Sequence, residues 1–309
     1  TGELDLAELS TKAGAHTAWV VLNEGASTQA RAAQAGASAR AVALRVYRPA
    51  HSTTLSEIAV PQGTAPDVVA SVVSYFSGQG RSVLRTVETP GLLGHNVMGA
   101  ALRAGLSLAL SGADPHEVDA AAQKLGFAHG PFRQIEAEGI EPVLTRLRRI
   151  ARARGLDEGP DLALLADRQA AVQAGRTPGR GFYASEGQRV VADPGLAGWL
   201  ADWRQVRGAD RPTLPDGVPL DRALHAALVN EGARLVAGKA VLRASDIDLC
   251  LVKGYGFDRA RGGPLLLSDI EGLLGLARTM KTLAPLAADV WAPHPLIDDM
   301  VKYGRRFFS

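Results

Sequence analysis

Short apolar runs rich in β-branched residues dominate the first 90 positions of the chain. Four of these runs predict strands over residues 17–22, 39–47, 55–60 and 82–88. Between the last two runs, a helical pattern places apolar residues at Val68, Val69, Val72, Val73 and Phe76. Strands that alternate with a helix of this length predict a parallel or mixed sheet with helical crossovers.

From Pro90 onward the pattern is helical, and it occurs twice. A long amphipathic helix within NVMGAALRAGLSLAL is followed by a short helix for which Asp114 is the expected N-cap. The segment LHAALVNEGARLVAGKAVLRASDIDLCLVKGYGF repeats this order. Both segments lead to Gly-Phe and then to Gly-Pro, at Gly126, Gly130, Gly256 and Gly263. We therefore predict one internal duplication of a helical unit of about 90 residues.

These patterns divide the chain into four parts and predict the fold class α/β plus all-α. Between the two helical units, DLALLADRQAAVQAG predicts a single helix among loops rich in Gly, Pro and Arg. The expected parts are an α/β domain, a first helical domain, a connector with one helix and a second helical domain, over residues 1–90, 91–155, 156–214 and 215–309.

The composition is that of a soluble globular protein, with 46% hydrophobic and 21% charged residues. A formal charge of +2 and scattered arginines argue against a nucleic-acid partner. No apolar run reaches the roughly 18 residues that a membrane span requires, and the first residues lack the pattern of a signal peptide. Because the chain has a single cysteine, Cys250, the simplest expected location is the cytoplasm.

Familiar catalytic motifs are absent from the sequence. The glycine pattern GRGFYA has no apolar strand before it and no helical pattern after it, so we interpret it as a connector loop rather than a phosphate-binding turn. The seven histidines never pair at a zinc spacing, so no metal site is predicted. Three candidate site residues remain, and each also has an ordinary structural explanation. Asn23 could be a turn residue, Glu57 a solvent-facing strand residue and His95 a residue in the first turn of a helix.

Four segments in the right order resemble the 3-hydroxyacyl-CoA dehydrogenase family, especially the multifunctional α-subunit-type enzymes of fatty-acid β-oxidation. ETPGLLGHNVM resembles the family's T-P-G-F-x-x-N-R junction, and GFAHGPFRQIEAEGI resembles its G-x-x-x-G-P-F segment. GRTPGRGFYAS and GYGFDRARGGPLLLSDIEG resemble the connector and the second helical domain. The resemblance implies a Rossmann-like NAD domain, of which residues 1–90 match only the second half, followed by two homologous helical domains. By this comparison the chain is either a fragment of a longer protein or has lost cofactor binding.

The resemblance also implies where the site residues fall. Family members use a His–Glu pair, in which the His takes the proton of the 3-hydroxyl and the Glu orients the His. Glu57 matches the Glu, but the His position twelve residues earlier holds Arg45. A guanidinium stays protonated and cannot act as a general base, so we expect Arg45 and Glu57 to form an ion pair. The substrate-contacting Asn of the junction falls on His95, while Asn23 and Arg48 match polar positions beside the cofactor.

The function implied by the resemblance is NAD-dependent oxidation of 3-hydroxyacyl-CoA to 3-ketoacyl-CoA. Because the Gly-rich loop and the His are missing, we expect this chain alone to be a poor or inactive dehydrogenase. The alternative is a non-catalytic scaffold that binds acyl-CoA, a thiolase-type subunit or a second copy of the chain. A half sheet leaves an exposed edge, so we expect upstream sequence or another chain to cover it.

Overall fold

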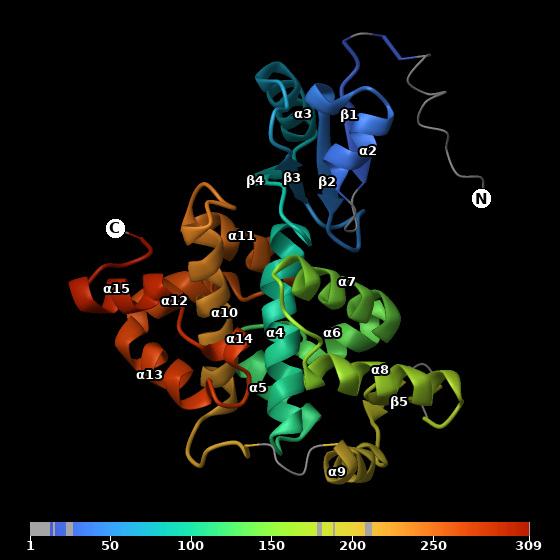
Figure 1. The fold of residues 1–309 in the computed structure, drawn as a ribbon, viewed down its shortest axis with the longest axis vertical. Helices are drawn as coiled ribbons and strands as arrows, with labels where there is room; N and C mark the ends of the chain where they lie inside the picture. Colours follow the sequence, from blue (N-terminus) through green and yellow to red (C-terminus); the bar gives the residue numbers. More distant parts are fainter. Residues whose placement is uncertain are drawn as a thin grey trace.

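The computed structural model describes residues 13–14, 16–22, 27–177, 181–187, 189–207 and 212–308. A small α/β unit stands at one end of the molecule, and a larger helical body forms the rest (Figure 1). Helix α4 (Leu92–Leu110) runs from the sheet down through the centre of that body (Figure 1). Nearly all of its residues are buried, which agrees with a sequence that is apolar around most of the helix.

The α/β unit is a four-stranded mixed sheet with the strand order β1-β2-β3-β4. The strands are β1 (Trp19–Leu22), β2 (Ala41–Val46), β3 (Leu55–Val60) and β4 (Ser82–Val87). Two parallel pairs, β1 with β2 and β3 with β4, are connected through α2 (Thr28–Gln34) and α3 (Pro66–Gly78), while β2 and β3 are antiparallel. The four predicted strands, the mixed sheet and α3 are confirmed, and α2 is an additional helix that the apolar pattern does not predict.

Helices cover the two faces of the sheet differently. On one face, α3 joins a cluster of six buried apolar residues: Val42, Leu44, Ile58, Val68, Val69 and Val72. On the other face, Ala43 and Ala59 contact Leu92 at the start of α4. Because alanine side chains are small, the first turn of α4 lies close to strands β2 and β3. This contact positions the candidate site described below.

The two edges of the sheet have different surroundings. At the β4 edge, the amide of Val87 donates to the carbonyl of Ala240 at 3.0 Å, and Thr86 bridges to Val241. At the β1 edge, Val20 and Leu22 are 40% and 68% exposed. Within the described residues no strand pairs with the outer edge of β1, and its coverage by upstream sequence or another chain stays a prediction.

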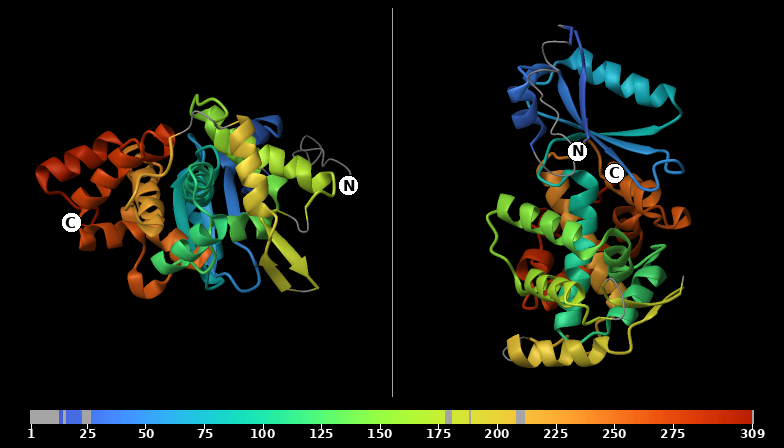
Figure 2. Two further views of the ribbon diagram at one scale, coloured as in Figure 1. Left: turned by 90° about the horizontal axis from the view of Figure 1, so that it is seen from below. Right: turned by 90° about the vertical axis from the view of Figure 1, so that its right-hand side faces the viewer.

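The helical body contains two runs of four helices in the same order. The first run comprises α4, α5 (Pro115–Leu125), α6 (Pro131–Glu138) and α7 (Ile140–Ala153). The second comprises α10 (Leu220–Ala237), α11 (Ala244–Tyr255), α12 (Pro264–Glu271) and α13 (Leu273–Leu283). The short helices α14 (Ala288–Trp291) and α15 (Pro295–Tyr303) follow. The long helices α4 and α10 pack against each other in the centre of the body, below the sheet (Figures 1 and 2).

The third helix of each run is capped in the same way. Asp119 accepts hydrogen bonds from the amides of Phe132 and Arg133, both at 2.8 Å, at the start of α6. Asp248 accepts from the amides of Leu265 and Leu266, both at 2.9 Å, at the start of α12. In each run an aspartate on the second helix therefore satisfies the free N–H groups of the third helix.

The two runs also meet through matching residues. The amide of Ala128 donates to the carbonyl of Gly256 at 3.2 Å, and the amide of Asp258 donates to the carbonyl of Gly126 at 2.7 Å. The Phe127 and Phe257 rings, which follow these glycines, meet edge to face with centroids 5.0 Å apart. The contacts are reciprocal, because the glycine carbonyl of each run accepts a hydrogen bond from the other run.

The connector departs from its prediction. It contains the predicted helix α8 (Pro160–Gln173), but also a hairpin of β5 (Tyr183–Glu186) and β6 (Arg189–Ala192) and a second helix, α9 (Leu196–Arg207). The prediction of a single helix among loops is therefore wrong. Tertiary packing stabilises α9, because its apolar side buries Leu200 and Trp203. None of the helices in the described ranges is long and apolar enough to cross a membrane.

Candidate functional site

The candidate site lies where strands β2 and β3 meet the first turn of α4. Arg45 on β2 and Glu57 on β3 are direct cross-strand partners in the antiparallel register. Side chains at such paired positions project from the same face of the sheet. The fold therefore brings together the two residues that the sequence singles out at a spacing of twelve.

Glu57 is fully buried, and its carboxylate is occupied by four hydrogen bonds. The amides of Leu93 and Gly94 donate to it at 2.6 and 3.2 Å, the Tyr47 hydroxyl at 3.0 Å and the Thr86 hydroxyl at 3.3 Å. The N-cap position of α4 is a glycine without a capping side chain. Glu57 therefore caps α4 from the neighbouring strand, a placement that the positive end of a helix dipole favours.

The expected ion pair between Arg45 and Glu57 is not formed. Arg45 Nη2 donates instead to the Tyr255 hydroxyl at 2.7 Å, and the guanidinium lies 4.4 Å from the centre of the Tyr47 ring. Burial disfavours the charged guanidinium, but the interactions with Tyr255, Tyr47 and Glu57 outweigh it and raise the pKa of Arg45. The physical reason for the wrong prediction is Tyr47, whose hydroxyl takes the place beside Glu57.

Tyr47 links the sheet to the second run of helices. Its hydroxyl donates to Glu57, so the Cys250 thiol, 3.1 Å away on α11, is the donor in their contact. Tyr255, at the end of the same helix, donates to the carbonyl of Gly94 at 2.8 Å. Sequence reasoning misses Tyr47, Cys250 and Tyr255. The only local signal was that Tyr47 lies two residues after Arg45, on the same face of the strand.

His95 lies on α4, next to this cluster. It is buried, and its Nδ1 atom has no hydrogen bond of good geometry, although the backbone of Gly91 lies close enough to raise the pKa of the imidazole against the larger effect of burial. Burial, together with the positive charges of Arg45 and Arg146, lowers the pKa of His95 far below its usual value. The imidazole is therefore neutral, but such a low pKa makes it a weak proton acceptor. A second histidine, His51, follows β2 in the sequence and is exposed on the surface.

Of the two residues predicted to lie beside the cofactor, the structure describes only Arg48. Asn23 lies outside the described residues. Arg48 is exposed beyond the end of β2.

At the start of α2, two backbone donors already have acceptors. The Thr28 amide donates to Glu88 Oε1 at 2.7 Å, and the Ala30 amide donates to the side chain of the N-cap residue Ser27 at 3.2 Å. An anionic phosphate at this helix end would compete with the Glu88 carboxylate for the Thr28 amide. Residues 23–26, which precede α2, lie outside the described residues.

The titratable groups around Glu57 hold their protons tightly. Arg45 stays protonated, burial raises the pKa of the Cys250 thiol to about 12, and burial also raises the pKa of Tyr47 and Tyr255 above their usual value. The described residues contain no group of three or more His, Cys, Asp or Glu side chains that could bind a metal ion. The site as it stands is a packed polar contact between the sheet and α11.

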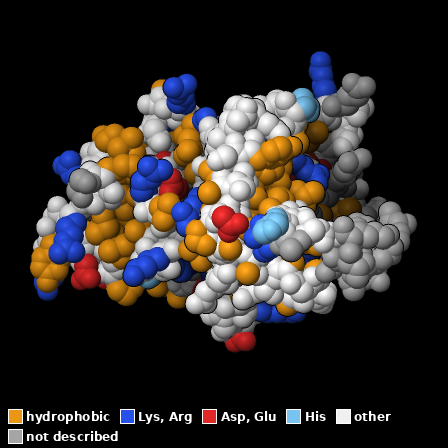
Figure 3. Space-filling model, turned by 90° about the horizontal axis from the view of Figure 1, so that it is seen from above, with side chains coloured by type: hydrophobic (Ala, Val, Ile, Leu, Met, Phe, Trp, Pro, Cys, Tyr) orange, Lys and Arg blue, Asp and Glu red, His pale blue; other side chains and the backbone are white. Residues whose placement is uncertain are grey.

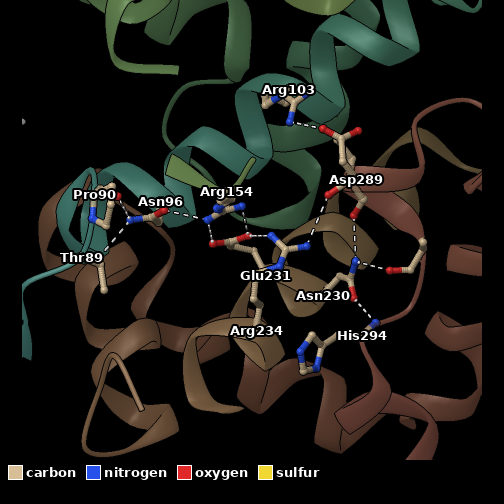
Figure 4. A network of polar contacts seen from close by, with 12 residues as sticks. Thr89, Pro90, Asn96, Arg103, Arg154, Asn230, Glu231, Arg234, Asp289 and His294 are labelled. Carbon is tan, nitrogen blue, oxygen red and sulfur yellow. Dashed lines mark hydrogen bonds and ion pairs between the residues drawn. The ribbon is translucent and has the colours of Figure 1, made fainter. Parts of the chain in front are cut away.

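A second polar cluster lies between the two runs of helices (Figure 4). Arg154, at the end of α7, donates to Asn96 at 2.7 Å and forms a two-pronged ion pair with Glu231 on α10. Arg103 on α4 is paired with Asp161 and with Asp289, which lies on α14. A small cleft between α4, α7 and α10 is lined by several of these residues. Its charges are paired with one another, so we regard it as a connection between the two runs.

Comparison with known proteins identifies the relatives of this chain. Residues 91–185 match the family model of the 3-hydroxyacyl-CoA dehydrogenase C-terminal domain. The chain is 26% identical to the peroxisomal bifunctional enzyme of Danio rerio over 282 residues, and 24% identical to the fatty acid oxidation complex subunit alpha of Shewanella loihica over 278 residues. The chain is related to the 3-hydroxyacyl-CoA dehydrogenases. The predicted resemblance is confirmed.

Solved structures of this family show the same fold. The 3-hydroxybutyryl-CoA dehydrogenase of Escherichia coli superposes with a TM-score of 0.75 at 18% identity, covering 96% of this chain and 78% of that chain. The dehydrogenase part of multifunctional enzyme 1 from C. elegans gives a TM-score of 0.61 at 16% identity, covering 97% and 70%. The alignments with the Danio and Shewanella proteins cover 84% and 87% of this chain but only 38% and 37% of those relatives. The dehydrogenase fold is thus shared, while the chain spans little more than a third of these curated relatives.

Proposed function

We propose that this chain is a 3-hydroxyacyl-CoA dehydrogenase-type module of fatty-acid oxidation that binds acyl-CoA but is impaired in the oxidation of 3-hydroxyacyl-CoA to 3-ketoacyl-CoA. The observation that supports this most is the set of partners of Glu57. Its carboxylate is bonded to Tyr47, Thr86 and the first turn of α4, and the cross-strand position holds an arginine. No group in the cluster is poised to accept the proton of a substrate hydroxyl.

The cofactor that the resemblance implies is NAD, which would accept the hydride in this reaction. The Thr28 amide at the start of α2 already donates to Glu88, and the Ala30 amide to Ser27. We derive no step of the reaction through NAD.

We also propose that the two runs of helices are homologous domains, produced by the duplication that the sequence predicts, and that the boundaries fall near residues 90, 155 and 214. The equivalent caps at Asp119 and Asp248 and the reciprocal contacts of Phe127 and Phe257 support this division. In a chain with two such units, the contact between the units takes the place of a contact between two subunits.

An NADH-consumption assay with acetoacetyl-CoA tests the proposal. We expect no turnover from the chain. We also expect none from the Arg45→His variant, because the Tyr47 hydroxyl still donates its hydrogen bond to the Glu57 carboxylate. The double variant Arg45→His, Tyr47→Phe removes that hydroxyl and is the matched comparison. Wild-type turnover at ordinary enzyme rates of roughly 1–1000 per second would contradict the proposal. Titration with butyryl-CoA, followed by calorimetry, tests acyl-CoA binding separately.

A second candidate function is a scaffold for subunit association. Hydrophobic side chains gather over the C-terminal helices, in the left half of the face in Figure 3. Ile270, Leu274 and Tyr303 on these helices are 71%, 50% and 59% exposed. Partners of this kind, whether a thiolase-type subunit or a second copy, stay predictions, as does the cytoplasmic location. Light scattering over a concentration series would distinguish self-association from a monomer that awaits a different subunit.

A further inference from the structure

Unpaired nitrogen atoms gather at the junction of β2, α4 and α7. The buried side-chain nitrogen and oxygen atoms without a hydrogen-bond partner in the described residues are Arg45 Nη1, His95 Nδ1, Arg146 Nε, Arg146 Nη2 and Arg148 Nε. Arg148 Nε lies 2.9 Å from Glu158, so an ion pair accounts for it. The other four belong to residues around the start of α4. Buried polar groups are rarely left without a partner, so such a concentration requires an explanation.

Arg146 and His95 belong to two helices, α7 and α4, that pack closely on either side of His95. Gly91 and Gly99 lie one turn before and one turn after His95 on the same side of α4. A Cβ atom at Gly91 would overlap Ile150, and one at Gly99 would come within 3.2 Å of Leu147. Arg146 is one turn before Ile150 on α7, and its positive charge acts on His95.

The free edge of Arg146 has the shape of a carboxylate-binding fork. Arg146 Nη1 donates to Glu138 at 2.6 Å, which leaves the Nε and Nη2 atoms, the side edge of the guanidinium, unpaired. Arg103 shows what this edge binds, because its Nε and Nη2 atoms hold the two oxygens of Asp161 at 2.6 and 3.2 Å. An arginine edge of this kind recognises the two oxygens of a carboxylate in parallel.

Arg45 adds positive charge to the junction but does not add a second pair of nitrogen atoms for a carboxylate. Its unpaired Nη1 atom lies against Gly94, where even a methyl group would overlap it. His95 is neutral, so its Nδ1 atom can carry the imidazole proton and donate it to an oxygen. The positive charges of Arg45, Arg146 and Arg149 all act on this histidine. Glu138 forms an ion pair with Arg146.

We propose that the Arg146–His95 junction binds the carboxylate of a ligand, with one oxygen on each nitrogen of the Arg146 side edge and His95 Nδ1–H donating to one of them. The ligand is a small carboxylic acid or an acyl group that ends in a carboxylate. The Arg146 nitrogens are closed to solvent, so the carboxylate enters through a local opening of the α4–α7 contact. That the site binds a carboxylate does not depend on the proposed function. That the carboxylate ends the acyl group of an acyl-CoA rests on the proposed function.

Calorimetry with two thioesters of similar acyl length, succinyl-CoA and butyryl-CoA, tests the acyl source. We expect succinyl-CoA to bind at least tenfold more tightly to the wild-type chain. This preference should disappear in Arg146→Met and in Arg146→Lys, which keeps the charge but loses the fork. It should persist in Arg152→Met, a control on the exposed side of the same helix. Equal affinities in the wild type, or a preference that survives in Arg146→Lys, would overturn the assignment to a carboxylate-ended acyl chain.

Titration with potassium succinate alone tests the carboxylate without coenzyme A. The Nε–H resonance of Arg146, assigned by its loss in Arg146→Lys, should shift as succinate is added and should not shift with potassium chloride. A resonance that succinate leaves unmoved means that water alone fills the junction and overturns the site. Succinate binding without any affinity for either thioester would keep the site and contradict the proposed acyl-CoA function instead, so the two failures are distinguishable.

Discussion

Glu57→Gln separates a structural role of Glu57 from a catalytic one. The carboxylate accepts from the amides of Leu93 and Gly94 and from two hydroxyl groups. An amide side chain keeps one acceptor oxygen and replaces the other by an NH₂ group, which cannot accept a bond. At least one buried amide of α4 then loses its partner. Each buried donor left unpaired costs about 1–3 kcal/mol.

We therefore expect Glu57→Gln to lower the free energy of unfolding by roughly 2–4 kcal/mol, the cost of one or two such donors. Urea unfolding measures this loss, and amide hydrogen exchange should show faster exchange at Leu93 and Gly94. Glu141→Gln, on the exposed first turn of α7, is the control, with an expected change within about 0.5 kcal/mol. If Glu57→Gln unfolds like the wild type and both amides stay protected, Glu57 does not cap α4 and the structural role is refuted.

Three further predictions concern packing, pH and the contact between the helical runs. Gly94→Ala should lower the midpoint of thermal unfolding measurably, because a Cβ atom there would overlap Arg45 and Tyr47. Burial raises the pKa of Asp248 from 3.8 to about 6, so its contribution to stability is present below pH 4 and is lost as the pH rises through 6. The stability of the wild type relative to Asp248→Asn should therefore fall by up to roughly 3 kcal/mol between pH 4 and pH 7, as measured by urea unfolding at each pH. Arg154→Met leaves the buried Glu231 carboxylate with only Arg234 and should cost about 3 kcal/mol; a loss below 0.5 kcal/mol would show that the ion pair with Arg154 contributes little.

Local sequence signals predict most of the fold. Runs of β-branched residues give all four strands of the sheet, and the N-cap Asp114 is confirmed because its side chain accepts from the amides of His116 and Glu117 at 2.7 and 3.3 Å. The connector fails because its hairpin and α9 are held by contacts with distant residues. Arg168 on α8, for example, donates to the carbonyl of Gly181 and to the carboxylate of Asp193, which lie two residues before β5 and one residue after β6.

In the candidate site, too, contacts that follow from local sequence could be predicted, and contacts with residues far along the chain could not. The cross-strand pairing of Arg45 with Glu57 follows from the spacing of two strands and is confirmed. Tyr255, which takes Arg45 away from Glu57, lies 210 residues along the chain and reaches the sheet only because α11 packs there. No period or motif around either residue indicates that contact. The partners of a buried arginine are decided by tertiary structure, which local patterns do not contain.

The hydrogen-bond partners of the buried polar groups distinguish two parts of the site. Loss of a catalytic histidine alone would leave the buried carboxylate of Glu57 without one of its partners, which is costly. Glu57 instead has four donors, among them the Tyr47 hydroxyl. Its surroundings are therefore adapted to a structural role. The side edge of Arg146 and the Nδ1 atom of His95 have no such partners. Unpaired buried groups require an explanation, and this is why we place the proposed carboxylate site at the α4–α7 junction rather than at the strand pair.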